Sequence, residues 1–254
     1  MNTGRPLLSL TSVAILMMLG AYLLFTFADS TTKWLVMAAS MPALQIAFMR
    51  YGVHLLICSV EVSVRGIHPG EIRDHLALLM LRGAMLSTAT AANFYALKYL
   101  TLSMYSAIMF SAPIFVSLLS WPVLGERVGP WRWTAIVCGF IGVLIIIRPF
   151  DSTFHPAALV SLYAAIAVAV YSTVTRKLAH RVRSHVMQFF TGAFGVVILL
   201  PFAVWLWQPV DSRILLLVAW VGLVSWGGHE LLTRAHKLAE ASVLMPYSYS
   251  FIIT

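Results

Sequence analysis

Long apolar stretches alternate with short polar connections along the whole chain. A helix needs about 20 apolar residues to cross the hydrocarbon core of a bilayer. No connection is long enough to build a soluble core of its own. The pattern therefore predicts an all-α integral membrane protein. The expected spans are residues 8–28, 42–61, 76–97, 101–124, 131–148, 156–176, 186–207, 213–233 and 240 onward.

Charged residues are scarce and lie mainly between these stretches. Only 17 Lys and Arg and nine Asp and Glu serve 254 residues, far fewer than the surface of a soluble domain carries. Most bases fall in the alternate connections that share a side with the N-terminus: Arg5, Arg65, Arg73, Arg82, Arg127, Arg132, Arg176, Lys177, Arg181, Arg183, Arg234 and Lys237. The opposite side has Lys33, Lys98, Arg148 and Arg213. This bias predicts a cytoplasmic N-terminus, and anionic lipid accounts for the net charge of +8 without a nucleic-acid partner.

The two halves of the chain resemble each other. Aligning Lys33 with Lys177 matches the exits of the first and sixth spans, and aligning Lys98 with Lys237 matches the turns after the third and eighth. The repeating unit contains five helices. Because five is odd, the second unit must enter the membrane from the other side, which is the inverted-repeat architecture of many secondary transporters.

The sequence thus predicts a ten-helix bundle of two inverted five-helix repeats. The first repeat covers residues 8–148, and the second covers 156–254 and is incomplete, with its last helix absent from this chain. We expect the natural protein to continue past Thr254 into a tenth helix.

Several motifs resemble those of the EamA-type branch of the drug/metabolite transporter superfamily. The resemblance covers roughly residues 12–148 and 157–254. It implies a ten-helix bundle, two five-helix repeats and transport of small metabolites, often outward. The motifs are Arg82-Gly83-Ala84, Asn93 to Leu100, Ala107 to Phe110, Pro113, Leu124 to Arg127, Gly139 to Val143, Ser172 to Leu178 and Ala239 to Leu244.

Arg50 is the sharpest candidate for substrate binding, since it lies inside the second span. A charge there is costly unless it is paired or faces water. Arg50 either binds an anionic group in the cavity, or pairs with Asp29 or a helix carbonyl. Asp29, at the outer end of the first span, is that partner or a cation site. His54 shares the helix face of Arg50 and is expected to be a neutral hydrogen-bonding group.

His229 and Glu230 form a second polar cluster near the inner end of the eighth span. A carboxylate or imidazole there can carry protons in a coupled cycle. The favoured alternative is an interface pair, with Glu230 bonded to Arg234 at helical i,i+4 spacing.

Pro113 and Pro246 occupy matching helices of the two halves, and each removes an intrahelical hydrogen bond. Paired helix breaks of this kind are typical of transporter sites, although a kink satisfied by neighbouring helices is the alternative. Ser111 and Ser248, near these breaks, are candidate hydroxyls for a ligand. Aromatic residues within or near the spans that could line an apolar cavity complete the candidate binding set: Tyr95, Trp226 and Tyr247.

The sequence therefore predicts a secondary transporter of small organic metabolites in a bacterial inner membrane, working by alternating access and favouring efflux of amino acids or related zwitterions. An importer or exchanger of a nucleotide-, riboflavin- or S-adenosylmethionine-like solute is the alternative, and an intramembrane enzyme is the rival from another class. The sequence shows no phosphate-binding loop, metal-ligand spacing or nucleophile elbow, so we expect no catalytic residue, metal or cofactor.

Overall fold

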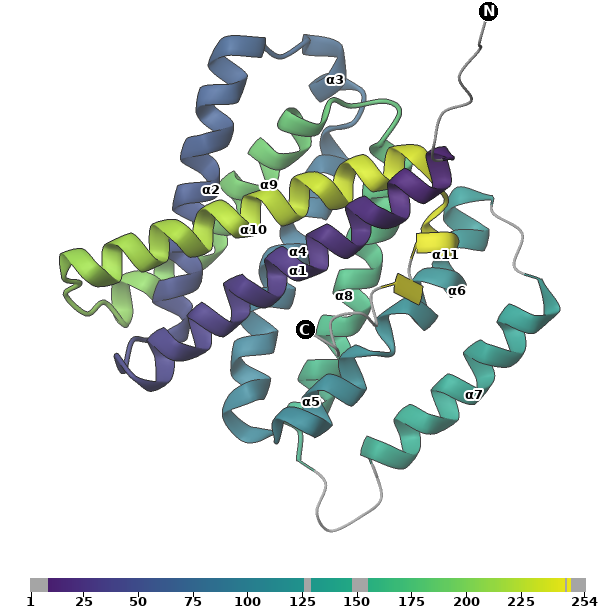
Figure 1. Ribbon diagram of the computed structural model, residues 1–254, viewed down its shortest axis with the longest axis horizontal. Helices are drawn as coiled ribbons and strands as arrows, with labels where there is room; N and C mark the ends of the chain where they lie inside the picture. Colours follow the sequence, from purple (N-terminus) through teal and green to yellow (C-terminus); the bar gives the residue numbers. More distant parts are fainter. Residues whose placement is uncertain (1–8, 126–128, 148–154, 245, 248–254) are drawn as a thin grey trace, which may run out of the picture.

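The computed structural model describes residues 9–125, 129–147, 155–244 and 246–247, and all regular structure within these ranges is helical. Figure 1 shows the arrangement of the helices. Their bounds are α1 Leu10–Met37, α2 Ala43–Arg65, α3 Pro69–Arg73, α4 Leu76–Tyr99, α5 Leu102–Met109, α6 Ala112–Leu124, α7 Pro130–Ile147, α8 Ala157–Leu178, α9 Ser184–Trp205, α10 Ser212–Leu238 and α11 Ala241–Leu244. Within the described residues, six segments are long and apolar enough to cross a membrane: α1, α2, Ala107–Leu124, α8, α9 and α10.

The helices occupy the predicted spans, but two of them run on well past the apolar stretch. Helix α1 continues to Met37 and α10 to Leu238. In α1 the hydroxyls of Thr31 and Thr32 donate to carbonyls four residues back, so polar side chains are satisfied without leaving the helix. Hydropathy therefore predicts where α1 and α10 leave the apolar layer of the membrane. It does not predict where these two helices end.

The predicted span at 101–124 is two helices. Helix α5 ends at Met109, and α6 begins at Ala112 with Pro113 in its first turn. A proline there costs little, because the first N–H groups of a helix lack an intrahelical partner in any case. The prediction of a helix break near Pro113 is confirmed, and its form is a restart of the helix rather than a kink. In the second half, α11 ends at Leu244, two residues before Pro246.

Helices from the two halves of the chain pack against one another. Helix α1 packs along α10, α4 along α8 and α2 along α9, with further contacts of α4 with α9 and of α10 with α2; α1 and α10 lie side by side in Figure 1. Glycines permit the closest approaches. A Cβ at Gly192 would lie 3.0 Å from the Cα of Leu55, and one at Gly195 would lie 2.2 Å from the Tyr51 ring. Small residues in this role are typical of membrane helix pairs.

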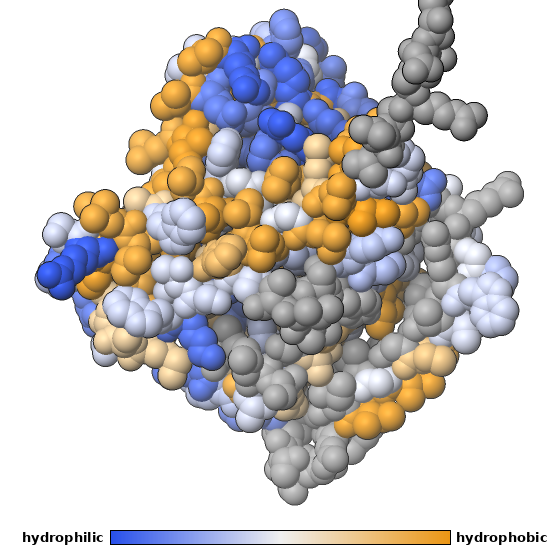
Figure 2. All heavy atoms as spheres, in the orientation of Figure 1, coloured by the Kyte–Doolittle hydropathy of each residue, from blue (hydrophilic) through white to orange (hydrophobic). Residues whose placement is uncertain are grey.

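The bundle has two ends of different character. The basic end, as we name it, comprises residues 65–76, 178–184 and 234–240, where α2, α8 and α10 end and α4 and α9 begin. The opposite end comprises residues 38–45, 99–102 and 205–212. In Figure 2 hydrophilic side chains gather around the end of α2, α3 and the start of α9, above a largely hydrophobic band.

Candidate substrate site and polar core

Arg50 lies half-buried seven residues into α2, which places it on the side of the opposite end. One terminal nitrogen donates to the Thr90 hydroxyl at 3.4 Å, and the Tyr51 hydroxyl lies 3.1 Å from the same oxygen. Thr90 itself donates to the Leu86 carbonyl at 2.9 Å. Arg50 therefore has one long hydrogen bond to a neutral partner, so most of its donor capacity stays available to a ligand.

Asp29 and Arg50 do not form an ion pair in the part of the chain that the structure describes, where such pairs reach 4.0 Å. Asp29 is exposed on α1, yet it lies within electrostatic reach of both Arg50 and Tyr105 of α5. Arg50 of α2 and Tyr105 of α5 thus each lie within electrostatic range of the Asp29 carboxylate. Because the two opposite charges are not joined, each is able to meet a charge on a ligand.

His54 and His229 come together in the middle of the bundle. Their ring centroids are 6.2 Å apart, and both residues are buried. His229 Nδ1 lies 3.0 Å from the Tyr171 hydroxyl, and its ring lies 4.8 Å from that of Phe25. Nε2 of His54 is buried without a hydrogen-bond partner among the described residues. His54, which was expected to share the helix face of Arg50, has its ring beside that of His229 on α10.

Arg82 was expected among the bases outside the membrane, and that expectation is wrong. Its side chain is fully buried within α4. All its N–H groups are used by neutral partners on three helices of the second half: Nε donates to Thr175 at 2.8 Å, and the terminal nitrogens donate to Tyr171, Met187, Thr191 and Thr233. Its guanidinium also lies 4.6 Å from the centroid of the Tyr171 ring. Arg82 therefore ties α4 to α8, α9 and α10, and it has no donor left for a ligand.

Glu230 forms the interface pair that helical spacing predicted. Its Oε1 accepts from Arg234 Nε at 2.7 Å, and its Oε2 accepts from the Ser184 hydroxyl. Since both carboxylate oxygens are engaged at the basic end, Glu230 acts as a tie between α10 and the first residue of α9.

The remaining predicted site residues are scattered. Tyr95 is 50 % exposed, with its ring 5.0 Å from that of Tyr99. The Ser111 hydroxyl donates to the Ile108 carbonyl at 2.6 Å, so it satisfies a backbone carbonyl at the break between α5 and α6. Trp226 is half-buried on α10 and Tyr247 is exposed after α11. Ser248 lies outside the described residues.

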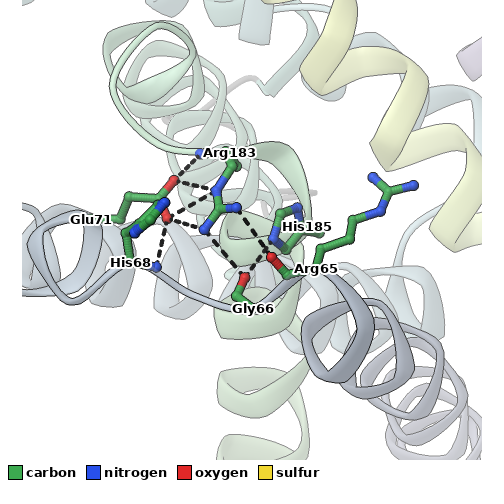
Figure 3. Close-up of polar contacts among 6 residues, drawn as sticks. All are labelled: Arg65, Gly66, His68, Glu71, Arg183 and His185. Carbon is green, nitrogen blue, oxygen red and sulfur yellow. Dashed lines mark hydrogen bonds and ion pairs between the residues drawn. The ribbon is translucent and has the colours of Figure 1, made fainter.

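A surface latch joins the two halves at the basic end. Arg183, the N-cap residue of α9, donates from Nε and a terminal nitrogen to Glu71 of α3, the shortest bond being 2.8 Å. It also donates to the carbonyls of Arg65 and Gly66, and His185 lies 3.2 Å from the same Gly66 oxygen. Figure 3 shows how these groups converge.

The latch stays charged over a wide pH range. Hydrogen bonds from the Arg183 side chain are the main cause that lowers the pKa of Glu71 to about 2. The same carboxylate raises the pKa of Arg183. Charge-assisted bonds with this bidentate geometry are stronger than neutral ones.

Sequence reasoning missed Arg82 as a core residue and the pairing of Arg183 with Glu71. A signal for Arg82 was present, because it lies inside the predicted span 76–97 rather than in a connection. No comparable signal marks Glu71, since its partner is 112 residues away.

Apolar helices of spanning length, tied through buried polar groups, define a multi-pass membrane protein. Residues 12–148 match the model of the EamA-like transporter family. The chain belongs to this family, which lies within the drug/metabolite transporter superfamily.

Curated relatives carry different substrate names. The chain is 25% identical to a riboflavin transporter of Vibrio cholerae, over 92% of this chain and 80% of the relative. It is 27% identical to a pseudopaline exporter of Pseudomonas aeruginosa, over 90% and 81%. It is also 27% identical to an S-adenosylmethionine uptake transporter of Rickettsia prowazekii, over 67% and 58%. A protein of known crystal structure, 19% identical, shares the fold with a TM-score of 0.72 over 94% of this chain and 84% of that one.

Proposed function

We propose that this protein is a secondary transporter that carries small zwitterionic metabolites, such as amino acids or their relatives, by alternating access between two inverted repeats. The membrane is the bacterial inner membrane, and the N-terminus and the basic end face the cytoplasm. The observation that carries the substrate class is the arrangement of Arg50 and Asp29, which are near each other but not paired.

The packing of the helices supports the inverted repeat. If α1 corresponds to α8 and α4 to α10, a twofold axis in the membrane plane turns the α1–α10 contact into the α8–α4 contact, and both are extensive. The same axis turns the α4–α9 contact into α10–α2. Each of those contacts has a glycine at the matching position. A Cβ at Gly83 would lie 2.9 Å from Phe194, and one at Gly222 would lie 2.5 Å from Val53.

The charges near α1 and α2 support a zwitterionic substrate. A substrate carboxylate has the free N–H groups of Arg50 to bind, in the bidentate geometry that arginine favours. A substrate ammonium has the exposed carboxylate of Asp29. Half-buried apolar residues beside Arg50, among them Phe48 and Phe94, are suited to a side chain of the substrate.

The ties at the basic end support export. With that end held closed by the latch and by Arg82, the Arg50 region is left to open toward the opposite end, as in the releasing state of an exporter. The relatives named for riboflavin and S-adenosylmethionine uptake keep an importer or exchanger as the second candidate. An intramembrane enzyme is disfavoured because the named relatives are transporters.

Transport by the purified chain in lipid vesicles tests the proposal. Counterflow of amino acids should saturate, as it does for a carrier and not for a channel, and the substrate should be recovered chemically unchanged. Arg50→Ala should abolish counterflow with little loss of folded protein, whereas Arg50→Lys should keep weak transport because it keeps the charge but loses the bidentate fork. Arg213→Ala, an exposed base at the start of α10, is the control.

A second comparison separates the role of Asp29 in binding the substrate from a role in pairing with Arg50. Asp29→Asn should weaken transport of a zwitterion more than that of an analogue without its amino group. If Arg50 served only to pair with Asp29, single variants would lower stability and the double variant would restore it. Normal kinetics in a well-folded Arg50→Ala variant would remove Arg50 from the site.

A further inference from the structure

The basic end contains an open pocket that the transport site does not use. Its volume is about 540 Å³, within the size range of small-ligand sites. It lies where α2 ends, α9 begins and α10 ends, on the far side of the polar core from Arg50. Its lining is Arg65, Arg183, Ser184, His185, Glu230, Arg234 and Lys237.

The lining is strongly positive. Four permanent cations face one acid, and Glu230 already has both oxygens bound, by Ser184 and Arg234. Among the cations, Arg183 is committed to Glu71. The others keep donors available. Arg65 and Arg234 have side chains 55 % and 51 % exposed, and the only pair of Arg65 in the described chain is a long 3.9 Å contact with Glu61.

Lys237 adds a cation that no described acid pairs within 4.0 Å. A cluster of several bases with a single, already bound acid attracts an anion with two or more charged or hydrogen-bonding oxygens. Phosphate groups fit this chemistry, because arginine forks and lysine ammonium groups both bind them.

The position of the pocket indicates the source of the phosphate. Its lining residues lie at the basic end. In Figure 2 the hydrophilic side chains around the end of α2 and the start of α9 adjoin a largely hydrophobic band. Lipid headgroups lie at this level of a membrane protein, and basic pockets between transmembrane helices on the cytoplasmic side bind anionic headgroups. We propose that the pocket binds the phosphodiester headgroup of an anionic phospholipid, and that this lipid braces the ends of α2, α9 and α10. The proposal does not depend on the transported substrate.

Lipid titration of the purified full chain tests the site. Phosphatidylglycerol added to detergent-solubilised protein should raise the melting temperature, and phosphatidylcholine should not, because its choline group cancels the phosphate charge. A bound lipid should also remain in native mass spectra. Lys237→Gln removes one charge without leaving an acid unpaired, and it should weaken phosphatidylglycerol binding about fivefold, since one base near a membrane contributes about 1 kcal/mol.

Two comparisons decide the assignment. Lys33→Gln, an exposed base on α1 near the opposite end, should leave phosphatidylglycerol binding unchanged. Glycerol 1-phosphate and inorganic phosphate, titrated alone, should stabilise the protein weakly at best, because they lack the acyl chains that the hydrophobic band holds. Equal stabilisation by the soluble phosphates would assign the pocket to a cytosolic anion instead. Equal lipid binding by wild type and Lys237→Gln, or by the two phospholipids, would overturn the proposal.

Discussion

The two ends of the bundle join the same halves of the chain by different chemistry. At the basic end, Arg183 and Glu71 form a charged, bidentate contact, and Arg82 anchors α4 to three helices of the second half. At the opposite end the cross-half bonds are neutral. Gln45 exchanges two bonds with the backbone of Gln208, at 2.7 and 2.8 Å.

This difference separates two arginines that both lie inside predicted spans of the sequence, Arg82 being fully buried and Arg50 half-buried. Arg82 has every donor engaged by the protein, whereas Arg50 has a single 3.4 Å bond to Thr90. A buried charge that is fully satisfied by the fold serves structure, and a charge left with open donors beside an unpaired acid is available to a ligand. The basic end is therefore held by many bonds between the two halves of the chain, and the region of Arg50 keeps donors available to a ligand.

Removal of Arg82 should have the largest effect on the fold. Arg82→Ala leaves a cavity and strips partners from hydroxyls on α8, α9 and α10, so the free energy of unfolding should fall by about 2–5 kcal/mol. Arg50→Ala, which breaks one long bond, should cost about 1 kcal/mol or less. Unfolding of both variants in a denaturing-detergent titration measures the contrast. Equal losses would show that the two arginines do not differ in role.

Breaking the latch should open the basic end. Cys58 is fully buried in α2, about two turns before Arg65, and can report the opening. In a Cys138→Ser background, Glu71→Gln should speed labelling of Cys58 by a maleimide roughly tenfold, because it removes charge-assisted hydrogen bonds worth about 1.5–3 kcal/mol. Asp74→Asn, an exposed acid in the same connection, is the control and should leave the rate unchanged. Unchanged labelling in Glu71→Gln would mean that the contact does not hold the end closed.

Much of the helical fold was predictable, because long apolar stretches have few ways to satisfy their backbone except as helices in a membrane. A helix break near Pro113 was also expected, although its form as a restart of the helix was not. The ends of α1 and α10 were not, since hydroxyls and long basic side chains let a helix continue past the apolar layer. The twofold relation of the halves was expected from matched lysines, and it stays a proposal that the packing supports.

The site was less predictable than the fold. Arg50 stood out because its charge is intramembrane, and the pairing of Glu230 with Arg234 followed from helical spacing. The partners of Arg82 and Arg183 depend on which helices meet in three dimensions. Local pattern contains no information about a contact between Glu71 and a residue 112 positions away.

The stabilisation of the fold by the Arg183–Glu71 latch should also decrease as the pH falls. The pKa of Glu71 is lowered to about 2 in the folded chain, from 4.5. Folding therefore favours the ionised form, and the stabilisation is present above pH 4.5 and is lost as the pH falls toward 2. The difference in melting temperature between wild type and Glu71→Gln should shrink across that window. A difference that stays constant down to pH 2.5 would exclude an ionised latch.

The last comparison concerns the opposite end, where Gln45→Ala removes the two neutral bonds to Gln208. Each such bond contributes about 0.5–1.5 kcal/mol, so the free energy of unfolding should fall by about 1–3 kcal/mol. Because these bonds hold the opposite end, where we propose that substrate binds, their loss should favour the state closed at the basic end. Cys58 labelling in the Cys138→Ser background should then stay level or slow, while Glu71→Gln speeds it. If Gln45→Ala exposed Cys58 as strongly as Glu71→Gln does, the two ends would open together, and the contrast between the two ends would fail.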